Sequence, residues 1–219
     1  MTLNFDADGF PDYFKLAPAI TLHDPLAEFL GASQNGLLTY RYIDAVRLAG
    51  HSCPTVAGAY LMVYRGLKAL YGGEMPERGG IGVVMQGGCG EGTAGVMAAV
   101  ATLLTGAAGE QGFGGIGMHR RFARRDLLRF GGDMDGVMSL HRHDTGEAVE
   151  VFYNAQRVPF AEQMAEIMPK AVSGAATGGE LQLFKELWQG RTRAILIDHA
   201  EDTDLVVVRP LPPGGNQAG

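Results

Sequence analysis

Cysteine is scarce in this chain, with two among 219 residues. A small secreted protein held together by disulfides needs more. The N-terminus also carries acidic and aromatic residues where a secretory signal would have a basic region and an apolar core. We therefore expect free thiols and a cytoplasmic protein. Two thiols are also too few for an iron–sulfur cluster, which is held by a larger set of cysteines.

Positive charge is in short supply as well. Lys and Arg number 18 against 24 Asp and Glu, and the net charge is −6. The composition excludes a nucleic-acid groove, because such grooves need clustered basic side chains. We interpret the one basic cluster, Arg120–Arg125, as a solvated loop, with a weak anion or acidic-partner site as the alternative. No apolar run approaches the roughly 20 residues that cross a bilayer, which excludes an integral membrane protein.

What the chain does have is hydrophobic content of 46%, enough for one good-sized core, and clear start and stop signals. Asp24 is the expected N-cap of the first helix, and Gly72 follows the longest one. The patterns predict helices over 26–30, 55–71, 93–105, 159–172 and 180–199. They predict strands over 37–48, 80–86, 137–143, 147–153 and 205–208.

Shifts in composition divide the chain into four segments. We expect an N-terminal arm with a short helix over 1–36, and a central domain over 37–156. A C-terminal helical segment over 157–209 packs on the same domain, and a Pro/Gly-rich disordered tail covers 210–219. The apolar stripe of Phe184 and Trp188 in the last helix is interpreted as core or dimer interface rather than a ligand site.

The most informative motif is His51-Ser52-Cys53-Pro54, where the predicted strand gives way to a helix. Pro54 suits the first helical position, which places Cys53 at the N-cap, where backbone N–H groups favour a thiolate. His51 lies two residues earlier on an extended segment and is expected on the same face. The alternative is a small buried cysteine beside a surface histidine.

The second thiol, Cys89, lies in a glycine-rich turn before the next helix. If the two preceding strands are neighbours in one sheet, their ends converge and His51, Cys53 and Cys89 form a metal site. His23 is the candidate for a further ligand, or else a hydrogen-bonded surface histidine. Mixed nitrogen and sulfur donors favour zinc, with nickel or iron as alternatives.

Three other interpretations use the same region or its neighbours. Glu91 is a candidate general base for a metal-bound water, although an acid favoured by a helix N-terminus is the preferred interpretation. Without a metal, Cys53 is a candidate nucleophile with His51 as its base, or a redox partner of Cys89. His141-x-His143 has metal-like spacing, but an exposed hairpin face is favoured.

The run Leu48-Ala49-Gly50-His51-Ser52-Cys53-Pro54, with Leu104-Thr105-Gly106 further on, resembles the signature of the FmdE-like family of formylmethanofuran dehydrogenase proteins over 37–154. The resemblance implies an α+β fold, here a mixed β-sheet packed with helices plus the C-terminal helices, often dimeric, with a metal near the His-x-Cys motif. The resemblance implies that His51 and Cys53 are metal-site residues, whereas Cys89 matches the family's cysteine before the second helix only loosely. A four-cysteine zinc ribbon of the kind some members carry is missing here, which argues against electron transfer.

Together these observations predict a cytoplasmic homodimer that binds one transition metal per protomer, zinc above all, with a small-molecule ligand at the metal. The first alternative is a metal- or cysteine-dependent enzyme acting on a one-carbon or acyl compound. The second is an interaction subunit of a larger redox complex, docked through the aromatic arm and Arg120–Arg125.

Overall fold

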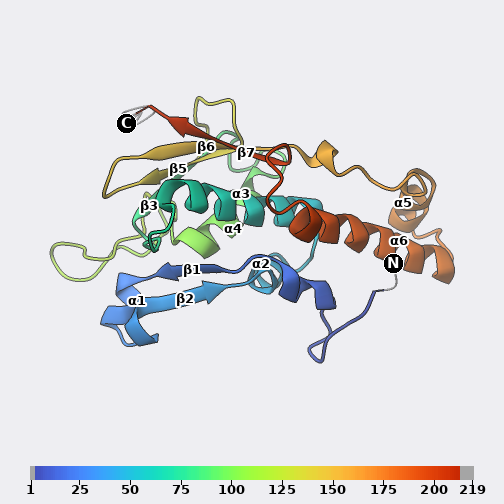
Figure 1. Ribbon diagram of the computed structural model, residues 1–219, viewed down its shortest axis with the longest axis horizontal. Coiled ribbons are helices and arrows are strands. Elements are labelled where there is room, and N and C mark those ends of the chain that lie inside the picture. The colour runs from blue at the N-terminus through green and yellow to red at the C-terminus, as the bar shows by residue number, and fades with distance from the viewer. Residues whose placement is uncertain (1–2, 213–219) are drawn as a thin grey trace.

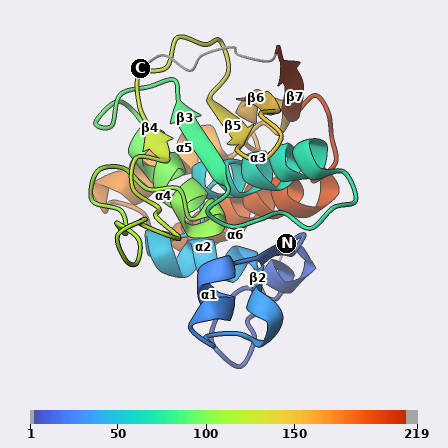
Figure 2. The same cartoon turned by 90° about the vertical axis from the view of Figure 1, so that its left-hand side faces the viewer.

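The protein, described over residues 3–212 by a computed structural model, has an α+β fold in three layers (Figures 1 and 2). A five-stranded sheet in the order β4-β3-β5-β6-β7 forms one layer, helices form the middle layer, and the pair β1-β2 forms the third. The β3–β4 pair is parallel and the other named pairs are antiparallel. The predicted α+β class with a mixed sheet is therefore confirmed.

The strands are β1 (Ile20–His23), β2 (Leu37–Tyr40), β3 (Ile81–Met85), β4 (Leu128–Arg129), β5 (Met138–Arg142), β6 (Ala148–Tyr153) and β7 (Val206–Leu211). The helices are α1 (Pro25–Phe29), α2 (Tyr42–Ala49), α3 (Pro54–Tyr71), α4 (Ala94–Thr105), α5 (Met164–Ser173) and α6 (Gly178–Arg193). A π-helical stretch, Ala194–Asp198, continues α6, and short 3-10 turns cover Asp12–Leu16, Gln34–Gly36 and Ala155–Arg157. No helix within 3–212 is both long and apolar enough to cross a membrane.

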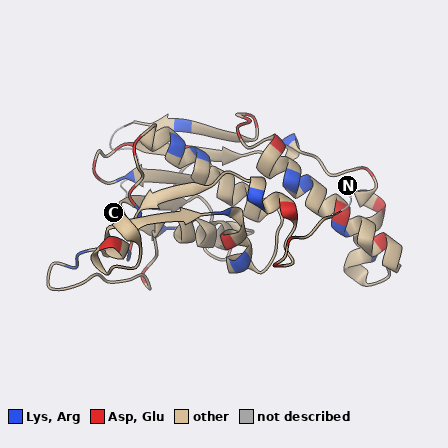
Figure 3. Ribbon diagram, turned by 60° about the horizontal axis from the view of Figure 1, so that its bottom comes forward, with Lys and Arg blue, Asp and Glu red and all other residues tan. Residues whose placement is uncertain are grey.

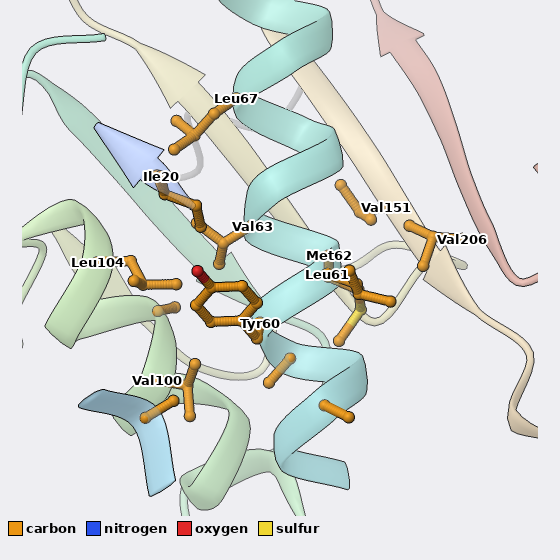
Figure 4. Packing of buried hydrophobic residues seen from close by; sticks show 14 of the residues in the cluster. Ile20, Tyr60, Leu61, Met62, Val63, Leu67, Val100, Leu104, Val151 and Val206 are labelled. Atoms are coloured by element: carbon orange, nitrogen blue, oxygen red, sulfur yellow. The ribbon is translucent and has the colours of Figure 1, made fainter. Parts of the chain in front are cut away.

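Helix α3 is the centre of the core. It is buried nearly all round, because the large sheet covers one side and α4 another. In Figure 4, Tyr60 lies beside Val100 and Leu104 of α4, while Leu61 lies on the side of Val206. All of these side chains are fully buried.

Two glycines let α3 approach the sheet closely. A Cβ atom at Gly58 would overlap the ring of Tyr153 on β6, and one at Gly66 would lie 2.5 Å from Cδ1 of Leu140 on β5. The Tyr153 hydroxyl donates a hydrogen bond of 2.9 Å to the Pro54 carbonyl. The first turn of α3 is therefore fixed to the sheet.

The predicted strand over 37–48 is wrong in its second half. Only Leu37–Tyr40 forms a strand, and α2 begins at Tyr42. Asp44 accepts the Arg41 N–H at 2.8 Å and so stabilises the start of α2. Tyr42, Ala45 and Val46 are buried at the 3–4-residue spacing of a helix, which the aromatic and β-branched content of this run concealed.

Most other predicted elements are confirmed within one to four residues at their ends, including the β5–β6 hairpin and the Asp24 cap of α1. Strand β1 was missed, and α5 begins at Met164 rather than at 159. Pro210 and Leu211 belong to β7 rather than to a disordered tail, and 213–219 lie outside the described residues.

Basic and acidic residues are interspersed along the elements (Figure 3). The cluster Arg120–Arg125 is only partly the solvated loop that we predicted, because the side chain of Arg124 is buried. Arg124 Nη2 lies 2.7 Å from Asp24 Oδ1, and Arg78 Nη1 lies 2.9 Å from Asp24 Oδ2. Arg121 lies over the rings of Phe29 and Phe122. Part of this charge thus stabilises the fold and is not directed at an anion.

Candidate functional site

Cys53 is the N-cap of α3, as predicted. Its backbone is extended, its Sγ accepts the Val56 N–H at 3.4 Å, and Pro54 occupies the first helical position. The residue is 8% exposed, so the sulfur lies at the edge of the core. The cap satisfies a backbone donor that would otherwise have no partner at the helix start.

His51 lies in the short connection between α2 and α3. Gly50 ends α2 with φ +75°, in the left-handed region that glycine adopts without strain. The exposed His51 ring has its Nδ1 3.0 Å from the Ala49 carbonyl. A carbonyl can only accept, so Nδ1 is the donor in this contact, and in the neutral ring the lone pair is then on Nε2. The prediction that His51 and Cys53 share a strand face is wrong, since this is a helix-to-helix connection with one exposed and one buried side chain.

Ser52 is held by residues that sequence reasoning did not connect to this motif. Its carbonyl accepts from Trp188 Nε1 at 3.0 Å and from Gln189 Nε2 at 3.2 Å, both on α6. Its hydroxyl lies 3.0 Å from the Tyr42 hydroxyl. We call residues 51–53 the His51–Cys53 corner. In the sequence, the one feature that pointed to this contact with α6 was the position of the chain's one tryptophan in a predicted amphipathic helix.

Cys89 is exposed, in the loop between β3 and α4. The expected convergence of two strand ends is wrong, because β2 pairs with β1 while β3 belongs to the five-stranded sheet. Cys89 borders a separate hollow of about 690 Å³, which we call the Cys89 hollow. Its polar lining includes Glu110, Asp126 and Arg129, and neither His51 nor Cys53 lines it.

The other candidates have local partners. Glu91 Oε2 accepts the Gly88 N–H at 3.0 Å, which closes the turn ahead of α4, and Glu91 lines a different hollow from Cys89. His23 Nε2 lies 2.8 Å from Glu28 Oε2, in agreement with a hydrogen-bonded histidine. His141 Nε2 lies 2.8 Å from Ser139 Oγ, and the His141 ring is half-buried rather than exposed.

These donors do not form a complete metal centre within the described part of the chain. Within 3–212, no three His, Cys, Asp or Glu side chains are arranged to hold a metal ion. The predicted set of His51, Cys53, Cys89 and His23 is therefore not assembled by this chain alone in the described conformation. The two donors of the corner have suitable chemistry, because a ligating histidine typically gives its other N–H to a carbonyl.

Comparison with known proteins gives a distant structural likeness. No family model matches the chain, and no curated protein matches it. Among solved structures, a tungsten formylmethanofuran dehydrogenase FmdE-like protein from Syntrophus aciditrophicus is 18% identical, with a TM-score of 0.40. The match covers 80% of this chain and 75% of that one. The likeness is remote.

Proposed function

We propose that the protein binds a transition-metal ion, with zinc expected, at the His51–Cys53 corner, and that a small molecule binds at the same ion. The observation that carries the proposal is the His51 ring. Its Nδ1–H donates to the Ala49 carbonyl, so in the neutral ring Nε2 holds the lone pair that can bind a metal, and Cys53 follows two residues later in the chain. Imidazole nitrogen and thiolate sulfur are zinc's preferred donors.

The two donors of the corner do not complete a zinc shell, since catalytic zinc sites have three protein ligands. The remaining positions then belong to water, to the small molecule, or to a donor from a second copy, in line with the predicted homodimer. When bound, the ion would act as a Lewis acid toward a ligand's oxygen. Helix α3 is already capped and packed without it, so binding is expected to be reversible and to contribute little to folding.

The test is metal content after purification without chelator and after incubation with one equivalent of zinc. We expect retention by the wild type, loss in His51→Gln and in Cys53→Ser, and retention in the matched control Cys89→Ser. Serine is a good N-cap, so Cys53→Ser should change the free energy of unfolding by less than about 1 kcal/mol. Absence of bound zinc in the wild type, or its retention in both corner variants, would contradict the proposal.

A second candidate function is favoured by the exposure of Cys89 at the edge of its hollow. In this proposal the thiol attacks an activated acyl compound, forms a thioester, and releases the alcohol portion of the substrate. With 4-nitrophenyl acetate we expect a stoichiometric burst of nitrophenolate from the wild type and from Cys53→Ser. Cys89→Ser should give none, and an unchanged burst in that variant would exclude the thiol.

A further inference from the structure

A further cavity lies next to Ser52 and is lined by residues of the N-terminal arm and of α6. We call it the arm pocket. It has a volume of about 330 Å³, at the lower end of the range for small-molecule sites. Its walls are mainly hydrophobic, with Phe5, Phe10 and Phe14 from the arm, Val46 from α2, and Phe184 and Trp188 from α6.

Contacts between aromatic rings hold the walls in place. Phe14 packs edge-on against Tyr42, with centroids 5.1 Å apart, and Phe184 lies 5.6 Å from Trp188. The Trp188 indole N–H is bonded to the Ser52 carbonyl, which fixes the orientation of the ring. Contacts within the chain thus fix the pocket walls, and a bound apolar group would need little rearrangement.

Among the polar side chains that line the arm pocket, only Lys185 is charged, and it has no ion-pair partner among the described residues. Gln189 accepts the Tyr13 hydroxyl at 2.6 Å and donates to Ser52, so both ends of its amide are engaged. Lys185 is the one charged side chain in the described lining, and it is exposed. It forms no ion pair with any described residue, and no Asp or Glu is part of that lining.

We propose that the arm pocket binds a small amphipathic carboxylate. Its aromatic or short alkyl body would lie between the arm and α6, and its carboxylate would lie at the Lys185 ammonium. The hydrophobic walls provide affinity, and the single positive charge selects an anion over a neutral or cationic molecule of the same shape. This inference goes beyond the proposed metal function and does not depend on it.

Trp188 provides a direct measurement, because it is the chain's one tryptophan and it lines the pocket. The probes are 4-phenylbutyrate and its neutral counterpart 4-phenylbutanol, titrated against tryptophan emission. We expect saturable changes with both compounds and tighter binding of the carboxylate. Phe5→Ala removes an exposed wall residue at little risk to folding and should weaken the binding of both compounds.

Lys185→Gln is the decisive variant. We expect about three- to fivefold weaker binding of phenylbutyrate, as for an exposed charge pair, and unchanged binding of phenylbutanol. Lys68→Gln is the matched control. It removes a positive charge on α3, outside the pocket lining, and should leave the binding of both compounds unchanged. Equal loss of both compounds in Lys185→Gln, or no saturable response in the wild type, would overturn the proposal. The proposal would also be overturned if Trp188 emission, measured without either compound, changed with protein concentration. That result would mean that a second copy of the chain occupies the pocket.

Discussion

His141 shows how one side chain can make stability depend on pH. It lies on β5, half-buried, with its Nε2 2.8 Å from Ser139 Oγ. Burial lowers the pKa of His141 below its ordinary value, and the nearby His143 lowers it further. The folded protein therefore resists protonation of this ring, whereas the unfolded chain takes up the proton near pH 6.5, the usual value for a histidine.

The expected result is a loss of stability on acidification. The contribution of neutral His141 is fully present above the unfolded pKa and is lost as the pH falls through the lower, folded pKa. The free energy of unfolding, measured with urea from about pH 7 to about pH 5, should decrease. His141→Gln should flatten this slope, whereas His119→Gln, at an exposed position, should not. Equal slopes in the wild type and His141→Gln would contradict the assignment.

At the scale of elements, the spacing between α3 and the sheet depends on glycine. A methyl group at Gly58 meets the Tyr153 ring, which is rigid and is anchored by its hydrogen bond to Pro54. Alanine normally stabilises a helix by about 1 kcal/mol relative to glycine. At Gly58 we expect the opposite sign, with a net loss of about 1–3 kcal/mol from overpacking.

Gly190→Ala in α6 is the matched control, because nothing lies within 4 Å of a Cβ atom at this position. We expect it to stabilise the protein by about 0.5–1 kcal/mol. The two variants should therefore shift the midpoint of chemical unfolding in opposite directions. A stabilising effect of Gly58→Ala would mean that α3 can move away from β6.

Features that depend on neighbouring residues were predicted correctly from the sequence, and features that depend on residues far apart in the chain were not. The caps at Asp24 and Cys53 depend on a few neighbouring residues, and both were predicted. The pairing of β1 with β2 and the exclusion of β2 from the large sheet depend on distant contacts. The predicted convergence of Cys89 with His51 and Cys53 relied on β2 and β3 being neighbours, which local patterns could not establish.

At the scale of the whole molecule, Asp24 connects three parts of the chain. It caps α1 in the N-terminal layer, and it pairs with Arg78 before β3 and with Arg124 after α4. Burial alone would raise the pKa of Asp24, but the hydrogen bond from Arg78 and the charge of Arg124 together lower it. The pairing is present at neutral pH and is lost only as the pH falls through this lowered pKa.

Asp24→Asn should therefore destabilise the whole protein. It leaves the buried Arg124 without its partner charge, at a cost of about 3–5 kcal/mol, and should lower the unfolding temperature for both the N-terminal pair of strands and the large sheet. Asp12→Asn, at an exposed position, is the control and should change stability by less than about 0.5 kcal/mol. Calorimetry that shows the two layers unfolding separately in the wild type would contradict this coupling.

The difference between the two thiols also sets how the chain responds to oxidation. Cys53 is buried and Cys89 is exposed. Each folded molecule therefore presents a single exposed sulfur, so an oxidant that reacts at exposed thiols can join two molecules through Cys89 but cannot extend the product into a polymer. The same feature makes the folded chain monovalent toward a thiol-directed label, which would report on one defined loop.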